Sequence, residues 1–155
     1  MRGFSSGYLR VGRYRGAPIR IHWTTPIAVF VLTRFSFNPL VWAALLGVLF
    51  VHEMGHALVA QQFHMRLVSI DITGVGGTCR LEGDPTVREA AIVAWGGVIA
   101  QAALLVVAII LRMMIGDWLD SVFHILITSN VVLIALNLLP IAPLDGATAW
   151  RLFKS

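Results

Sequence analysis

His52-Glu53-Met54-Gly55-His56 lies in the second half of an apolar segment that extends from Pro39 to Ala60. In a helix, residues four positions apart share one face, so His52 and His56 can direct two imidazoles at one metal ion. Glu53 lies at the edge of that face, where a carboxylate can take a proton from water. Two nitrogen ligands beside a carboxylate base are the groups that a zinc hydrolase uses. The stretch therefore predicts a metal site with hydrolytic chemistry.

The same stretch has a plainer interpretation, in which two core histidines are satisfied by hydrogen bonds and the glutamate has no role. The apolar surroundings argue against it. A charged side chain near the centre of a bilayer costs about 2.5–3.5 kcal/mol on insertion scales. Because His52, Glu53 and His56 are the only ionisable residues in the segment, their grouping favours metal binding.

The composition indicates an integral membrane protein. Of the 155 residues, 57% are hydrophobic and 13% are charged, and the mean hydropathy is +0.80. Soluble domains carry about 25% charged residues. At about 20 residues for each transmembrane helix, the length allows about four spans. We expect one domain over 1–155 with a membrane all-α fold: about four transmembrane helices and a small membrane-associated β-hairpin or sheet.

Four apolar segments are the expected spans, and they cover residues 23–35, 39–60, 90–111 and 121–139. A basic cytoplasmic tail over 1–20, ending in a short strand near Ala17–Trp23, precedes the first span. Partial alternation followed by several glycines predicts a β-hairpin over 66–83, although an ordinary cytoplasmic loop is the alternative.

The positive charges favour a membrane orientation with both termini inside. With a net charge of +4, the basic residues border the apolar segments and do not line a hydrophilic face, which argues against nucleic acid as a partner. Ten of the twelve basic residues fall on the inner side in this topology: Arg2, Arg10, Arg13, Arg15, Arg20, Arg66, Arg80, Arg88, Arg151 and Lys154. Arg34 and Arg112 fall on the outer side. Cys79 is the sole cysteine and cannot form an internal disulfide.

A zinc ion with two histidine ligands needs at least one more protein ligand. Asp145 is the best candidate, because the second and fourth spans both run inward and Asp145 follows two prolines that end the fourth helix. Broken helix of this kind lets polar backbone line a cavity. Asp71, in the expected hairpin, is the second candidate.

Two motifs carry a specific likeness. One is His52-Glu53-Met54-Gly55-His56, and the other is Asn137-Leu138-Leu139-Pro140-Ile141-Ala142-Pro143-Leu144-Asp145-Gly146. Together they resemble the site-2 protease family of intramembrane zinc metalloproteases. The segment Ala17–Trp23 is similar to the family's opening. Gly76-Gly77 and Leu81-Glu82-Gly83-Asp84-Pro85 are similar to its membrane-associated strand region.

The resemblance implies that His52, His56 and Asp145 bind one Zn²⁺ per chain and that Glu53 is the catalytic carboxylate. It also implies that Asn137 contacts the substrate backbone or the tetrahedral intermediate. Gly76 and Gly77 belong to a region expected to hold an unwound substrate segment by strand addition. The expected substrate is a transmembrane segment of another protein, cleaved in or near the lipid bilayer. A multi-pass protein of the bacterial inner membrane with cytoplasmic termini is expected, and the oligomeric state stays open.

The chain departs from the family pattern in the third expected span. Gly96-Gly97-Val98-Ile99-Ala100-Gln101 stands where members often carry A-G-P-x-x-N, so Val98 and Gln101 replace a proline and an asparagine. The departure concerns the helix shape and one polar contact, not the metal ligands. We expect no PDZ or CBS domain of the kind that many members carry.

Two other functions compete with proteolysis. One is a catalytically inactive membrane binding protein that sequesters a transmembrane partner, and Glu53 argues against it because metal binding alone does not need that carboxylate. The other is a metal transporter, which would spread polar ligands over several spans, whereas the first and third expected spans offer almost none.

Overall fold

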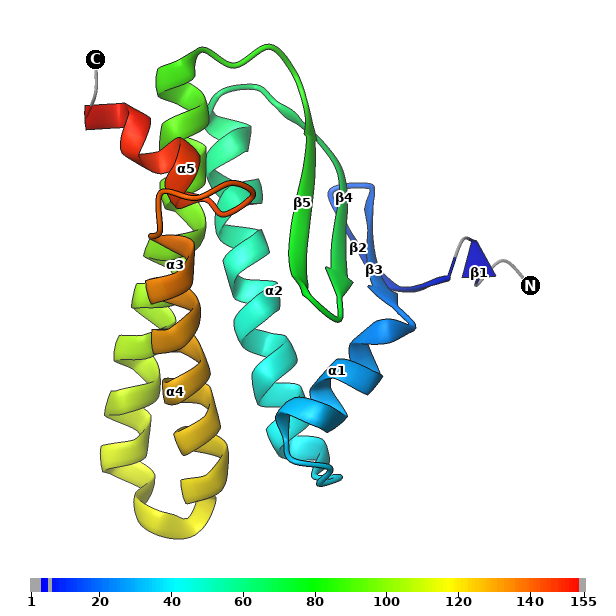
Figure 1. The fold of residues 1–155 in the computed structure, drawn as a ribbon, viewed down its shortest axis with the longest axis vertical. Helices are drawn as coiled ribbons and strands as arrows, with labels where there is room; N and C mark the ends of the chain where they lie inside the picture. The colour runs from blue at the N-terminus through cyan, green and yellow to red at the C-terminus, as the bar shows by residue number, and fades with distance from the viewer. Residues whose placement is uncertain (1–3, 6, 154–155) are drawn as a thin grey trace.

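Helix α2 (Pro39–Gln62) runs through the middle of the molecule, between a helical hairpin on one side and a β-sheet on the other (Figure 1). The computed structural model describes residues 4–5 and 7–153, so Arg2 and Lys154 of the charge pattern lie outside the described residues. Contacts join α2 to α3 (Val87–Ile115) and α4 (Asp120–Asn137), and to strands β4 (Arg66–Thr73) and β5 (Gly76–Glu82). The histidine motif on α2 therefore lies where residues of both the helical hairpin and the sheet can contact it.

The start of α2 follows from its sequence. Asn38 is the N-cap, and its side-chain oxygen accepts hydrogen bonds from the backbone N–H groups of Leu40 and Val41 at 3.1 and 3.3 Å. Pro39 occupies the first helical turn, where a missing N–H costs nothing. The helix thus begins at the residue that the sequence predicted.

A helical hairpin packs against α2. It consists of α3 (Val87–Ile115), the 3-10 helix η1 (Gly116–Leu119) and α4 (Asp120–Asn137), and α3 and α4 lie side by side (Figure 1). α3 begins with a capping box, which Thr86 and Glu89 form. Helical backbone continues from α3 through η1 into α4 without an intervening coil segment.

The sheet has five strands in the order β1-β2-β3-β4-β5: β1 (Phe4–Ser5), β2 (Tyr8–Tyr14), β3 (Ala17–His22), β4 (Arg66–Thr73) and β5 (Gly76–Glu82). β3 and β4 pair in parallel, and the other neighbours are antiparallel. The predicted hairpin is confirmed as β4 and β5. The chain before residue 17, expected as a tail, adds two strands. β5 is an edge strand of this sheet, and it contacts α2.

Asp71 joins three strands of the sheet. Its carboxylate accepts hydrogen bonds from Arg20 Nε and Nη2 at 2.6 and 2.7 Å, and Arg80 Nε lies 3.0 Å away. The side chain of Asp71 is 1% exposed. The hydrogen bond from Arg20 to Asp71 raises the pKa of the guanidinium above its ordinary value. Asp71, the second candidate ligand, is thus committed to two arginines and lies outside the group of side chains that surrounds His52.

Within the residues that the structure describes, two segments are long and apolar enough to cross a membrane, Pro39–Gln62 and Val87–Asn137, and the second contains both α3 and α4. Within the most apolar part of the second segment, 17% of the residues are buried inside the protein. Apolar side chains exposed to this extent need a partner such as lipid. α1 (Thr24–Leu32) has nine residues, or about 14 Å of helix, against a hydrocarbon core of about 30 Å. The count of four spans is therefore not confirmed.

Candidate metal centre

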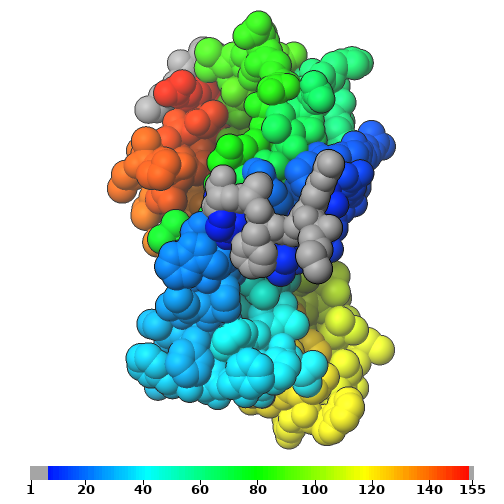
Figure 2. All heavy atoms as spheres, turned by 90° about the vertical axis from the view of Figure 1, so that its right-hand side faces the viewer, coloured from blue at the N-terminus to red at the C-terminus, as the bar shows by residue number. Residues whose placement is uncertain are grey.

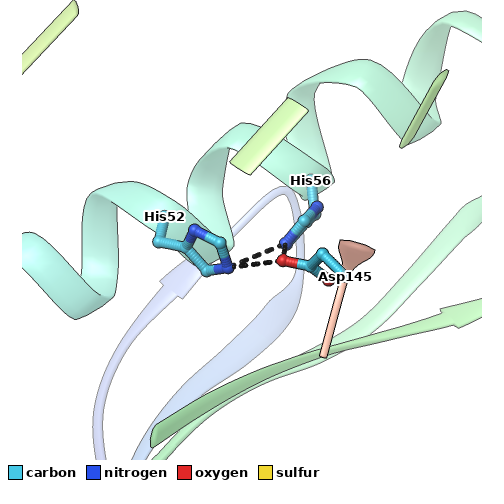
Figure 3. Close-up of side chains that lie close together, drawn as sticks. All are labelled: His52, His56 and Asp145. Carbon is cyan, nitrogen blue, oxygen red and sulfur yellow. Dashed lines mark hydrogen bonds and ion pairs between the residues drawn. The ribbon is translucent and has the colours of Figure 1, made fainter. Parts of the chain in front are cut away.

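Three side chains meet between α2 and the segment that follows α4 (Figure 3). Oδ2 of Asp145 lies 2.9 Å from Nε2 of His52 and 3.1 Å from Nε2 of His56. The two Nε2 atoms lie 3.1 Å apart. The two imidazoles come from successive turns of α2, and the carboxylate comes from 89 residues along the chain.

The chain after α4 folds back to deliver Asp145. α4 ends at Asn137, and Pro140 and Pro143 prevent the regular helix from continuing. Two indole groups then secure the returning segment. Trp150 Nε1 donates to the carbonyl of Leu138 at 2.6 Å, and Trp95 Nε1 donates to the carbonyl of Ala149 at 3.1 Å. These bonds tie the short helix α5 (Gly146–Ala149), which begins directly after Asp145, to α3 and to the end of α4.

Hydrogen bonds at Nδ1, on the side of each ring away from Asp145, determine which ring nitrogen carries the hydrogen. His56 Nδ1 lies 2.8 Å from the carbonyl oxygen of Val93, and His52 Nδ1 lies 3.1 Å from Oε1 of Gln101. A carbonyl oxygen can only accept, so each Nδ1 carries the hydrogen in a neutral ring. Each Nε2 therefore presents a lone pair toward Asp145.

These three groups fit a divalent metal. Two lone pairs and a carboxylate oxygen within 3.1 Å repel one another unless a cation lies among them. Nitrogen and oxygen donors with imidazole Nδ1 atoms bonded to carbonyl oxygens are the ligand set and outer contacts that catalytic zinc uses. Three protein ligands leave a fourth position for water or substrate.

Glu53 lies beside this group at the edge strand of the sheet. It is 4% exposed, and its carboxylate is near His52, His56 and the backbone N–H of Cys79. A methyl group added at Gly77 would collide with the Glu53 side chain, its carboxylate carbon lying 2.6 Å away. Glycine at position 77 therefore makes room for Glu53. Burial, assisted by the negative charge of Glu53, raises the pKa of the Cys79 thiol to about 12, so Cys79 offers no thiolate at neutral pH.

Glycines also let α3 approach the imidazoles. A methyl group at Gly97 would lie 2.5 Å from His56 Nε2 and 2.6 Å from His52 Cε1. At the preceding residue, a methyl group on Gly96 would lie 2.7 Å from the backbone oxygen of Gly55. The Gly96-Gly97 pair therefore lets α3 pack closely against α2.

A cavity of about 590 Å³ opens onto the candidate centre. Asn137 lies at its wall, with Nδ2 3.4 Å from His52 Nε2. Every site residue predicted from the sequence contributes to the lining, namely His52, Glu53, His56, Gly76, Gly77, Asn137 and Asp145. The structure thus brings the predicted residues together, and their chemical roles stay predictions.

The comparisons with known proteins agree on one family. The family profile described as Peptidase M50B-like matches residues 23–143. The chain belongs to the site-2 protease family. A zinc metalloprotease of Methanocaldococcus jannaschii is 26% identical over 159 residues, which cover 95% of this chain and 45% of that protein. Rip3 of Mycobacterium tuberculosis is 28% identical over 167 residues, which cover 92% of this chain and 42% of that protein.

The fold agrees with a solved structure of the same family. A site-2 protease from Methanocaldococcus jannaschii matches with a TM-score of 0.76 at 20% identity, over 96% of this chain and 72% of that one. The site-2 protease family is membrane-embedded, which agrees with the exposed apolar helices. The chain spans less than half the length of the curated relatives it matches.

Sequence reasoning did not assign two groups that touch the imidazoles. Gln101 departs from the family pattern, yet its side chain makes the contact to His52, and α3 is continuous through Val98. The carbonyl of Val93 carries no sequence signal, because any residue at that position supplies a backbone oxygen. For Gln101 a signal existed: it is the one side-chain amide in the apolar part of the third expected span.

Proposed function

We propose that this chain is an intramembrane zinc metalloprotease that hydrolyses peptide bonds in or near transmembrane segments of other proteins. The observation that carries the proposal is the convergence of His52, His56 and Asp145 beside the buried carboxylate of Glu53. The metalloprotease names of the relatives support the reaction class.

His52 and His56 would hold the zinc through Nε2, and Asp145 through Oδ2, with one ion per chain. When bound, zinc supplies a Lewis acid that makes water more acidic and polarises a peptide carbonyl. Val93 and Gln101 keep the hydrogens on the opposite ring nitrogens, so both Nε2 atoms remain available.

Glu53 is the proposed general base. It lines the same cavity as the two imidazoles, and the narrow space at Gly77 fixes its position. Glu53 takes a proton from the attacking water and passes it to the leaving amide nitrogen. Its burial excludes bulk water from the carboxylate, which favours transfer to the substrate.

Asn137 and the edge strand are the proposed substrate contacts. Asn137 donates from Nδ2, close enough to the metal ligands to stabilise a negatively charged oxygen on the reacting carbonyl carbon. A transmembrane substrate must unwind before its peptide bonds can react, because a helix engages its own amides. The β5 edge at Gly76 and Gly77 lines the cavity and could pair with the unwound segment.

The proposal includes a membrane orientation. We place both termini on the cytoplasmic side of a bacterial inner membrane, with a transmembrane protein as substrate and no nucleic acid partner. The alternative, an inactive binding protein that sequesters a transmembrane partner, is not favoured, because it gives no use for a carboxylate held beside three metal-ligating groups.

The catalytic assignment is tested by Glu53→Gln. The amide has nearly the same size as the carboxylate but cannot take the proton, so cleavage of a transmembrane substrate should stop while zinc content stays at the wild-type level. The measurement is cleavage of a tagged single-span substrate, co-expressed and followed by immunoblot, together with zinc analysis of the purified variant. Cleavage at the wild-type rate by Glu53→Gln would show that another group is the base.

A further inference from the structure

The two imidazoles of the candidate centre are held by different kinds of acceptor. The carbonyl of Val93 belongs to the backbone of α3, so it fixes His56 wherever the helix is formed. His52 instead depends on Oε1 of Gln101, a side chain that could be lost without any change in the helix. One of the two imidazoles therefore depends on the identity of a single residue.

We infer that Gln101 is a positioning residue that holds His52 in the Nδ1–H form, with Nε2 directed at the metal. The inference rests on the proposed function for the identity of the ion. It concerns an arrangement of the metal-free protein as well, because the hydrogen bond is formed between side chains of the chain itself.

Gln101 is itself held in place. It is fully buried, and its backbone carbonyl accepts a hydrogen bond of 3.0 Å from Nδ2 of Asn130, which is also fully buried. Gln101 Nε2 has no hydrogen-bond partner among the residues that the structure describes. Leaving a buried donor unpaired costs free energy, so the favourable contact that the Gln101 side chain makes is the one from Oε1 to His52. A leucine or methionine would fill the same space without that cost, so the acceptor oxygen is the group that the position requires.

The orientation of the amide decides what His52 can do. If Nε2 of Gln101 faced the ring, Nδ1 would have to accept, and the hydrogen would move to Nε2 of His52. That hydrogen would then point at His56 Nε2 and Asp145 Oδ2, 3.1 and 2.9 Å away, in the place of the ion. The amide orientation with Oε1 toward the ring is the one that leaves His52 able to bind metal.

The test uses two substitutions of Gln101 and one matched control, each in the full chain purified in detergent. Gln101→Met keeps the length of the side chain and removes the acceptor oxygen, whereas Gln101→Glu keeps an acceptor. Gln61→Met is the control, because Gln61 also has a buried Nε2 without a partner among the described residues but lies near the end of α2, nine residues beyond His52. Zinc affinity is measured by competition with a chelator, and thermal unfolding is measured for each variant.

We expect Gln101→Met to weaken zinc binding by about 10–100-fold, and Gln101→Glu and Gln61→Met to stay close to wild type. The second readout is the ¹⁵N spectrum of histidine-labelled, metal-free protein. It should show His52 and His56 of the wild type as Nδ1–H forms, with the preference lost at His52 alone in Gln101→Met. Wild-type zinc affinity in Gln101→Met, or an Nε2–H form of His52 in the wild type, would overturn the inference.

The two readouts separate this inference from the proposed function. If the wild type binds no zinc, the proposed function fails, and the metal-free spectrum still decides whether Gln101 sets the form of His52. If Gln101→Met does not fold, the wild-type spectrum decides the question, because an Nε2–H form of His52 would contradict the inference.

Discussion

At the scale of single residues, the candidate centre depends on two glycines as well as on its functional side chains. Gly97 brings the backbone of α3 against both imidazoles, and Gly77 brings β5 against the carboxylate of Glu53. In each case a methyl group would occupy space that a functional side chain now fills. These glycines serve close approach and not unusual backbone conformation, since neither has a positive φ angle.

Gly97→Ala should disturb the metal ligands directly. The added methyl group would lie 2.5 Å from His56 Nε2, so the imidazoles must move. Misplacement of about 1 Å in catalytic groups costs about 100-fold in rate, and we expect a loss of that order in substrate cleavage together with weaker zinc binding. Cleavage and zinc affinity of the purified variant check this.

Gly47→Ala is the matched control. Gly47 lies on α2, and a methyl group there meets nothing within 4 Å. Alanine is favoured over glycine inside a helix, so the variant should keep its zinc and its activity and unfold no more easily than wild type. Equal behaviour of the two alanine variants would contradict the assignment of Gly97 to the ligand contacts.

The sequence correctly predicts contacts between side chains that lie within one helix. His52 and His56 lie on one face of α2 because residues four positions apart in a helix share a face. The contact between His52 and Gln101 could not be derived in this way, because it depends on how α3 is rotated against α2. That rotation depends on the close approach of Gly55 on α2 to Gly96 on α3, and this contact is known only from the three-dimensional arrangement of the two helices.

At the scale of elements, the sheet is linked by an ion-pair cluster around the buried carboxylate of Asp71. Asp71 on β4 contacts Arg20 on β3 and Arg80 on β5, so one carboxylate joins three strands. β3 and β4 are parallel and distant in sequence, and no tight turn connects them. The cluster therefore contributes to a strand pairing that local sequence does not enforce.

Arg20→Met should weaken the sheet and leave the metal site intact. The change removes two short hydrogen bonds from a carboxylate that is 1% exposed, while Arg80 remains. Hydrogen bonds to charged groups contribute about 1.5–3 kcal/mol, and we expect the free energy of unfolding to fall by about that amount. Denaturant unfolding in detergent measures the fall, and zinc analysis should give the wild-type content.

Arg66→Met provides the comparison for that prediction. Arg66 lies 3.7 Å from Glu82, and both side chains are mostly exposed, at 82% and 63%. Exposed ion pairs contribute little, so its unfolding should match wild type. If Arg20→Met unfolds like Arg66→Met, the cluster at Asp71 does not stabilise the sheet.

The sequence predicts some strands and helices correctly and misses others, and the difference depends on whether their sequence signal is local. The hairpin of β4 and β5 was predicted because alternation and a glycine turn are local signals. The sequence predicts a basic tail where β2 lies, because arginines at 10 and 13 obscure a strand whose polar side chains are largely exposed. The first helix was expected to span the membrane, and α1 is shorter because Thr33 ends it after nine residues.

At the scale of the whole molecule, the fold brings together groups that are far apart in the chain. α2 supplies two imidazoles, the segment after α4 supplies Asp145, and β5 supplies the wall beside Glu53. In the side view the sheet covers one face of the helices, with α1 and the start of α2 below it (Figure 2). The candidate centre is therefore enclosed by helices on one side and by the sheet on the other.

Whole-molecule prediction depended on topology. Asp145 was chosen because the second and fourth helices were expected to run in the same direction, which places their ends at one level. The structure brings Asp145 within 2.9 Å of His52, which agrees with that reasoning. The predicted number of four membrane crossings is not confirmed. Among the described residues, length and apolarity identify two segments, and one of them contains the α3–α4 hairpin.

The central claim is that His52, His56 and Asp145 together hold one zinc ion. The most direct measurement is the zinc content of the purified wild-type protein and of Asp145→Ala, by elemental analysis after removal of loosely bound metal. We predict about one zinc per wild-type chain and almost none in Asp145→Ala, because two imidazoles alone bind zinc too weakly to retain it. Full zinc content in Asp145→Ala, or none in the wild type, would contradict the account.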